Sequence, residues 1–177
     1  LEATGADISA TSLGNTVKGL NRDVTIRDIV STYIYPNTLK TLCVTRAQLK
    51  CALERSAEYF AIDADGKLKV SESFLTPIEQ HFNYDYFSGI EAAFDIRRSV
   101  GDRVVSIKYK GEELSGDKRL TLCMNNYRAS GAGGYDIYRQ CQTVRELPTE
   151  IAELIIAYVD KHRNITVDKH KWLKLIY

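Results

Sequence analysis

Apolar residues recur at helical spacing in three segments of the chain. Two of these segments begin with a capping box, Thr25 with Asp28 and Thr45 with Gln48, the usual start signal of a helix. The spacing predicts a short helix over residues 26–33 and a longer one that starts after Thr45. A third helix is predicted to open at Pro148, because proline is favoured in the first helical turn. The predicted buried stripes are Ile26, Ile29, Val30 and Tyr33; Leu49, Ala52, Leu53, Ala57 and Phe60; and Ile151, Leu154, Ile155 and Tyr158.

Strands are predicted over residues 38–44, 90–96, 103–110 and 119–124, where the residue pattern is typical of half-buried extended chain. Turns are predicted at Tyr35-Pro36-Asn37 and at Asp63-Ala64-Asp65-Gly66. Helices and strands follow one another without the regular strand–helix–strand order of a doubly wound sheet. The pattern therefore favours the α+β class, with a mixed sheet packed with helices.

Length and charge limit the classes of function. A chain of 177 residues predicts one domain with a proper core. With 24 basic and 23 acidic residues, the net charge of +1 argues against a bulk electrostatic grip on a nucleic acid polymer or a membrane surface. No apolar run reaches the 18 residues of a membrane span. Because the chain starts without Met or a signal-peptide pattern, it is expected to be a piece of a longer polypeptide.

Cysteine and histidine residues show no metal-binding or redox spacing. The cysteines are Cys43, Cys51, Cys123 and Cys141, and none forms a C-x-x-C pair. They are predicted to be small buried residues, with one disulfide left open as an alternative and a thiol-redox protein disfavoured. The three histidines are scattered, so no metal site is predicted in this chain.

The most informative segment is residues 125–135, Asn-Asn-Tyr-Arg-Ala-Ser-Gly-Ala-Gly-Gly-Tyr, directly after a predicted strand. Glycines let a backbone approach a ligand closely, and Tyr127 and Tyr135 offer flat apolar faces. Neither a P-loop nor a G-x-G-x-x-G motif is present, so a nucleobase pocket is favoured over a phosphate cradle. The alternative is a glycine-rich loop whose tyrosines pack for stability.

Four blocks of sequence together resemble a known family. They are Tyr33 to Leu39, continued by Val44-Thr45 and Leu49-Lys50; Phe82 to Asp85, continued by Ser88-Gly89-Ile90 and Asp95-Ile96; Val100 to Val104; and Asn125 to Gly131. In order and spacing they resemble the C-terminal domain of the 5′-nucleotidase family, in particular its bifunctional 2′,3′-cyclic-nucleotide 2′-phosphodiesterase/3′-nucleotidase branch. The resemblance extends from about Ala6 to Trp172.

The resemblance implies a division of labour within a longer enzyme. Residues 1–177 correspond to a nucleotide-binding C-terminal domain without catalytic or metal-binding residues, because the G-N-H-[DE] motif is missing. An N-terminal metallophosphoesterase domain of the same polypeptide is expected to hold two divalent metal ions and perform the hydrolysis. Expected substrates are nucleoside 2′,3′-cyclic phosphates and 3′-nucleotides. Family members are exported, so a periplasmic, secreted or cell-wall-attached location is expected.

The resemblance also assigns a substrate site. It implies that a nucleobase lies between Tyr35 and Tyr127. Arg128 is predicted to contact base or phosphate, with a surface arginine as the alternative, and Ser12, Asn15 and Arg22 are placed near the polar end. The full predicted substrate-binding set is Tyr35, Asn37, Tyr127, Arg128, Ser130, Gly131, Gly133 and Gly134.

Two departures separate this chain from typical 5′-nucleotidases. Gly133 stands where those enzymes carry an acidic residue that binds ribose hydroxyls, and residues 7–12 replace an N-G-G-x-I-R segment. The loss of the carboxylate suits a sugar already esterified at its 2′ and 3′ positions, which favours the cyclic-phosphodiesterase branch. A 5′-nucleotidase or UDP-sugar hydrolase domain and a non-enzymatic ligand-binding or interaction module remain alternatives.

Overall fold

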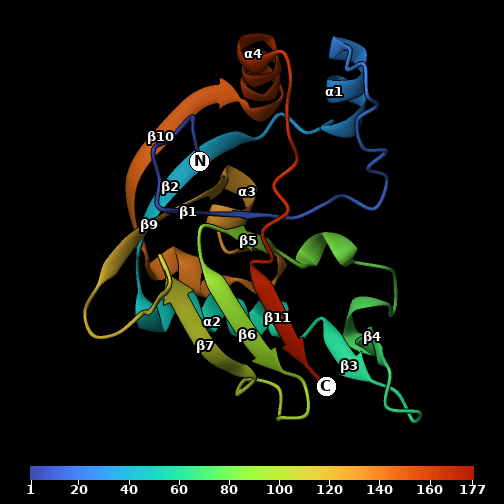
Figure 1. The fold of residues 1–177 in the computed structure, drawn as a ribbon, viewed down its shortest axis with the longest axis vertical. Helices are drawn as coiled ribbons and strands as arrows, with labels where there is room; N and C mark the ends of the chain where they lie inside the picture. The colour runs from blue at the N-terminus through green and yellow to red at the C-terminus, as the bar shows by residue number, and fades with distance from the viewer.

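The computed structural model describes residues 1–177 and places a five-stranded sheet beside a smaller four-stranded one (Figure 1). The larger sheet has the order β10-β2-β9-β1-β5, in which β1 and β9 run parallel and all other neighbours are antiparallel. It is therefore a mixed sheet. Its strands are β1 (Ile8–Thr11), β2 (Thr38–Thr45), β5 (Tyr86–Ser88), β9 (Arg119–Asn125) and β10 (Gln142–Glu150).

The smaller sheet has the order β11-β6-β7-β8, and its first pair is parallel. After α4, the C-terminal segment crosses the molecule to add β11 beside β6 (Figure 1). A separate hairpin pairs β3 with β4. The strands are β6 (Glu91–Asp95), β7 (Val104–Tyr109), β8 (Glu112–Glu113), β11 (Leu173–Ile176), β3 (Phe60–Ile62) and β4 (Leu68–Val70).

Helix α2 packs against both β2 and β7, so that it joins the two sheets through one core. Helices α1 and α4 contact each other beyond the end of the larger sheet (Figure 1). None of the helices is both long and apolar enough to cross a membrane. The α-helices are α1 (Ile26–Thr32), α2 (Arg46–Ala57), α3 (Asn126–Ala129) and α4 (Ile151–His162); the 3-10 helices are η1 (Glu72–Phe74), η2 (His81–Asn83), η3 (Ala132–Gly134) and η4 (Asp136–Gln140).

The α+β class and both capping boxes are confirmed. The prediction for Pro148 was wrong, since this residue lies in β10 and α4 begins at Ile151. Strand β10 was missed because its mostly exposed residues show no apolar alternation. Proline is tolerated there because β10 is the edge strand of its sheet. Phe60 lies in β3 instead of on the preceding helix.

The cysteines differ in their surroundings. Cys123 is buried, Cys43 and Cys141 are half-buried, and Cys51 is exposed, so the prediction of a buried residue was wrong for Cys51. It lies in α2 on the side opposite the core, where a small side chain meets solvent. All four thiols are free.

A single carboxylate ties the two sheets together. Asp7, at the entrance to β1, accepts a hydrogen bond from the Tyr109 hydroxyl of β7 at 2.7 Å. Its other oxygen accepts from the backbone N–H and the hydroxyl of Thr121 in β9, at 2.8 and 2.7 Å. Burial raises the pKa of Asp7, but these hydrogen bonds from Thr121 and Tyr109 outweigh it, so the pKa lies below its usual value.

The chain passes from one sheet to the other directly beside Asp7. Gly89, between β5 and β6, has a φ of +89°, and a Cβ there would lie 2.5 Å from the Asp7 carbonyl oxygen. Only glycine permits this torsion and this approach. The two sheets therefore approach each other closely at this crossing, where Asp7 hydrogen-bonds to both.

We expect Asp7→Asn to destabilise the protein at neutral pH, because the charge-assisted hydrogen bonds between the sheets are weakened. A lowered pKa in the folded state stabilises the fold above the unfolded pKa of about 3.9, and this contribution disappears as the pH falls through the folded value. The difference in melting temperature between wild type and variant should therefore shrink between pH 7 and pH 3. Asp65→Asn, in an exposed turn, is the control. A difference that stays constant with pH would contradict the assignment.

Candidate functional site

A cavity of about 560 Å³ opens where several strands of the five-stranded sheet begin or end. Its walls come from the segment after β1, from α1 and the turn that follows it, from Phe82, from the end of β9 with α3, and from α4. Most of the lining is apolar. The lining residues are Thr11, Ser12, Leu13, Gly14, Thr16, Val17, Leu20, Ile29, Thr32, Tyr33, Ile34, Tyr35, Asn37, Phe82, Asn125, Tyr127, Ile151 and Ile155.

The sheet topology brings several strand ends together at this cavity. Because β1 and β9 are parallel, their last residues, Thr11 and Asn125, lie at the same end of the sheet. The antiparallel partner β2 starts there, with Leu39 opposite Asn125, and β10 ends there, with Glu150 opposite Thr38. The first residues of α4 follow at once, and the Ile151 N–H donates to the Asn37 carbonyl at 2.9 Å. Four strand ends thus bring distant segments to one place.

Tyr35 and Tyr127 both line this cavity. Tyr35 lies in the turn between α1 and β2, and Tyr127 lies in the single turn of α3. Their exposed fractions are 55% and 52%. Each ring therefore presents apolar surface to an open cavity.

A small polar group occupies the same wall. The side-chain amide of Asn37 donates to the Tyr33 hydroxyl at 3.5 Å, and the Asn125 amide lies close to that hydroxyl as well. Burial raises the pKa of Tyr33, although both amides act in the opposite direction. Tyr33 is therefore a neutral phenol at physiological pH.

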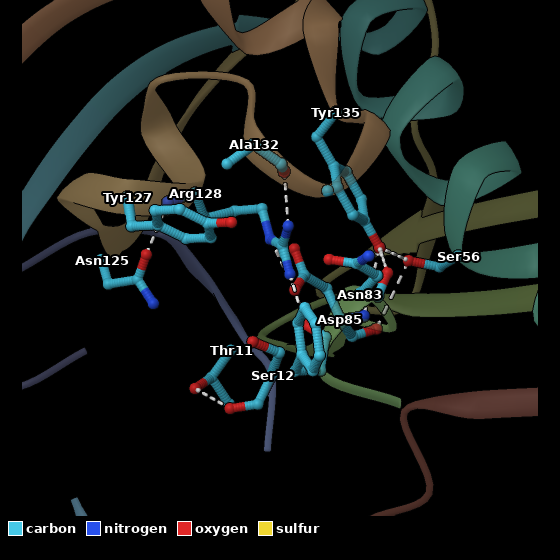
Figure 2. A network of polar contacts seen from close by, with 12 residues as sticks. Thr11, Ser12, Ser56, Asn83, Asp85, Asn125, Tyr127, Arg128, Ala132 and Tyr135 are labelled. Carbon is cyan, nitrogen blue, oxygen red and sulfur yellow. Dashed lines mark hydrogen bonds and ion pairs between the residues drawn. The ribbon is translucent and has the colours of Figure 1, made fainter. Parts of the chain in front are cut away.

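Behind the cavity lies a buried ion pair, drawn in Figure 2. The Arg128 guanidinium donates through Nε to Asp85 Oδ1 at 3.0 Å, and the two side chains are 3% and 1% exposed. It also donates to the Phe82 carbonyl at 2.7 Å and to the Ala132 carbonyl. Burial raises the pKa of Asp85 to about 6, while Arg128 acts to lower it.

The second tyrosine of the glycine-rich segment belongs to the core. Tyr135 is 1% exposed, and its hydroxyl shares a hydrogen bond of 2.8 Å with Ser56 and accepts the Asp85 N–H at 3.1 Å. Its ring stacks on Tyr138 and receives the Arg128 guanidinium at 4.5 Å. The alternative offered by the sequence, a tyrosine that packs for stability, is correct for Tyr135.

The glycines of this segment make room for arginines. A Cβ at Gly131 would lie 2.7 Å from Arg139 Nε, and one at Gly134 would lie 2.6 Å from Arg55 Nε. A Cβ at Gly133 would collide with the Arg128 guanidinium and with Asn83. All three residues have positive φ. The positive φ, together with crowding against arginine side chains, therefore explains why glycine is required here.

Of the predicted substrate-binding residues, the structure brings Tyr35, Asn37 and Tyr127 together around the cavity. Arg128 lies behind the wall as a buried residue, which differs from both a ligand contact and a surface arginine. Ser12 lines the cavity, whereas the exposed Arg22 does not, and Asn15 binds the Glu79 carbonyl instead. The remaining predicted residues lie outside the lining: Ser130, Gly131, Gly133 and Gly134.

Several lining residues were missed by the sequence analysis. Ile151 and Ile155 were interpreted only as the buried stripe of a helix, and Phe82 only as part of a family block. Asn125 was interpreted only as the first residue of the glycine-rich segment and of a family block. No group of three or more His, Cys, Asp or Glu side chains is arranged to hold a metal ion.

Comparison with known proteins matches residues 1–140 to the family described as 5′-nucleotidase, C-terminal domain. A 2′,3′-cyclic-nucleotide 2′-phosphodiesterase/3′-nucleotidase from Haemophilus influenzae is 30% identical over 125 residues, which are 61% of this chain and 18% of that protein. The trifunctional nucleotide phosphoesterase protein YfkN from Bacillus subtilis is 23% identical over 155 residues, 81% of this chain and 10% of that protein. The chain thus spans only a small part of its relatives.

Solved structures give the same fold. A putative 5′-nucleotidase from Staphylococcus aureus, in complex with alpha-ketoglutarate, superposes with a TM-score of 0.93 at 37% identity over the whole chain, which covers 34% of that protein. The NAD nucleotidase of Haemophilus influenzae superposes with a TM-score of 0.74 at 19% identity, over 97% of this chain and 30% of that one. The predicted 5′-nucleotidase C-terminal-domain-like fold is confirmed.

We expect the ion pair behind the cavity to be strongly coupled. Asp85→Asn and Arg128→Met should each lower the free energy of unfolding by about 3–5 kcal/mol, because each leaves a buried group without its partner. The double variant Asp85→Asn/Arg128→Met should lose less than the sum of the single variants, as measured by urea denaturation. Asp102→Asn breaks the exposed pair with Arg98 and should cost less than about 1 kcal/mol. Additive losses would show that the two side chains act independently.

Proposed function

Because this chain belongs to the 5′-nucleotidase C-terminal domain family, we propose that it is the substrate-binding domain of a nucleotide-hydrolysing enzyme, in which a nucleobase stacks between Tyr35 and Tyr127. The observation that carries the proposal is that both rings line one cavity while remaining half-exposed. Stacking on an aromatic side chain contributes about 1–3 kcal/mol per base and tolerates every base, because each has a π-face.

The geometry suits a planar ligand with one polar end. The apolar surface of Tyr35, Tyr127 and Phe82 suits a flat heterocycle, and the hydroxyl-bearing residues Ser12 and Thr11 line the same cavity and suit its sugar. Few precisely placed polar groups in an apolar cavity are typical of small-molecule sites. This chain binds and orients the nucleoside, and the scissile phosphate is left outside for another part of the polypeptide.

The reaction itself is assigned to a metallophosphoesterase domain in the rest of the parent protein. Two divalent metal ions bound in such a domain would supply an activated water and positive charge for the hydrolysis of a phosphate ester. We propose 2′,3′-cyclic nucleotides and 3′-nucleotides as substrates, on the basis of the relatives that carry these activities in their names. Export to the periplasm, the medium or the cell wall is proposed for the same reason of kinship.

The absence of a side chain at Gly133 does not distinguish an esterified sugar from a free diol in this structure. Its missing side chain would point at the buried Arg128 and Asn83, outside the cavity lining. A carboxylate at this position of this chain would therefore face the ion pair and not a ribose. The preference for an esterified sugar over a free diol rests on the relatives alone, and free-diol 5′-nucleotides are the second substrate class to assay.

Tyr127→Ala should weaken the binding of adenosine 3′-phosphate by about 5- to 150-fold, because one stacking face is lost. Tyr35→Ala should have an effect of the same size, and both variants should keep the wild-type melting temperature because the rings are half-exposed. Isothermal titration calorimetry of the 177-residue chain measures both affinities.

Tyr86→Ala provides the matched control, since this tyrosine is 49% exposed and lies outside the cavity. If all three variants bind as wild type does, the stacking model is wrong. If the wild-type chain binds no nucleoside or nucleotide at all, the domain is an interaction module instead.

Removal of metal should separate binding from hydrolysis. We expect EDTA to abolish hydrolysis of 2′,3′-cyclic AMP by the parent polypeptide and to leave the affinity of the 177-residue chain for adenosine unchanged, because this chain has no metal-binding cluster. Phosphate release and calorimetry measure the two quantities. Hydrolysis by the 177-residue chain on its own would contradict the assignment of the chemistry to another domain.

A further inference from the structure

We propose that Asn125 reads the edge of the bound base, by donating a hydrogen bond from its side-chain amide to a ring nitrogen or carbonyl oxygen of the heterocycle. This inference rests on the proposed function, because it requires a base stacked on Tyr127. Asn125 is the last residue of β9, it lines the cavity, and it stands two residues before that ring.

The orientation of the Asn125 amide is fixed by the backbone. Its oxygen Oδ1 accepts the Arg128 N–H at 2.6 Å, as Figure 2 shows. The side chain of Arg128 is anchored by Asp85 and by the Phe82 carbonyl, which holds the turn that carries this donor. A flip of the amide would place two donors against each other. Nδ2 is therefore the amide atom that is left for the cavity.

Nδ2 carries two hydrogens, and the chain uses at most one of them. The amide lies close to the Tyr33 hydroxyl, which also accepts a hydrogen bond from Asn37 at 3.5 Å. The second hydrogen is left for a ligand. Since Asn125 is only half-buried, solvent satisfies this hydrogen while the cavity is empty, and a ligand must replace that solvent with an acceptor.

This requirement defines the class of ligand. A purine or pyrimidine presents ring nitrogens and carbonyl oxygens on its edge, whereas an aromatic hydrocarbon of the same shape leaves the amide unpaired. Stacking cannot make this distinction, because it depends on the face of the ring. A site built to donate to its ligand rejects an analogue without the acceptor far better than an apolar wall does.

Two substitutions test the role without disturbing the fold. Asn125→Asp and Asn125→Ser keep an oxygen that accepts the Arg128 N–H, since aspartate and serine are as good helix N-caps as asparagine, but neither carries an NH₂ group. We expect both variants to keep the wild-type melting temperature and to bind adenosine about tenfold more weakly. Adenosine is uncharged, and the serine variant adds no charge, so electrostatic repulsion does not contribute.

Modified ligands identify the acceptor. We expect one of 1-deazaadenosine, 3-deazaadenosine and 7-deazaadenosine to bind the wild-type chain about tenfold more weakly than adenosine, because the ring nitrogen that accepts from Asn125 is replaced by C–H. For that analogue, Asn125→Asp should cause no further loss, and for the other two it should cause the full loss. This pattern is a coupling between one side chain and one ligand atom.

The outcomes separate this inference from the proposed function. If Tyr127→Ala weakens adenosine binding while Asn125→Asp and Asn125→Ser bind as wild type does, the stacking site stands and the role of Asn125 is wrong. If both Asn125 variants weaken all three deaza analogues equally, the residue acts without a specific base contact and the inference also fails. If the wild-type chain binds no nucleoside, the proposed function fails and this inference falls with it.

Discussion

A buried guanidinium requires hydrogen-bond acceptors to replace the water it has lost. At position 128 this requirement determines how the glycine-rich segment folds. Arg128 reaches Asp85 and two backbone carbonyls while only 3% exposed. The backbone must curl around it, so Gly133 has no space for a side chain. The Phe82 carbonyl accepts a hydrogen bond from Arg128, and Tyr127 directly precedes Arg128 in the chain. Both residues line the cavity, so Arg128 joins two cavity walls that are far apart in sequence.

Hydrogen bonds at strand ends and turns position three residues of the cavity lining. Tyr35, Asn125 and Tyr127 project from strand ends and single turns that are fixed by the sheet, the Asn125 cap and the Ile151–Asn37 hydrogen bond. The family match ends at residue 140, yet Ile151 and Ile155 of α4 complete the apolar wall. The part of the chain beyond the matched segment is thus a structural component of the site.

Local sequence patterns predicted the helices and strands whose formation depends mainly on interactions between residues close in sequence. The helices that begin after Thr45 and Thr25 follow from capping boxes, and β9 follows from apolar alternation. Strand β10 and the position of Arg128 depend on tertiary partners, namely the edge of β2 and the carboxylate of Asp85, which no local pattern contains. The glycines illustrate the difficulty. Glycine is equally required for approach to a ligand and for packing against an arginine, so sequence alone could not distinguish the two.

The proposed nucleobase site would divide recognition between stacking and hydrogen bonding. Stacking on aromatic faces would contribute affinity without selectivity, since every base stacks. A side-chain amide with a fixed orientation would contribute selectivity between bases but little affinity. In this fold both come from one turn, because the backbone N–H of Arg128 orients Asn125 while the side chain of Arg128 holds the turn that carries Tyr127. A change in the buried ion pair would therefore alter affinity and selectivity together, although neither Arg128 nor Asp85 touches the cavity.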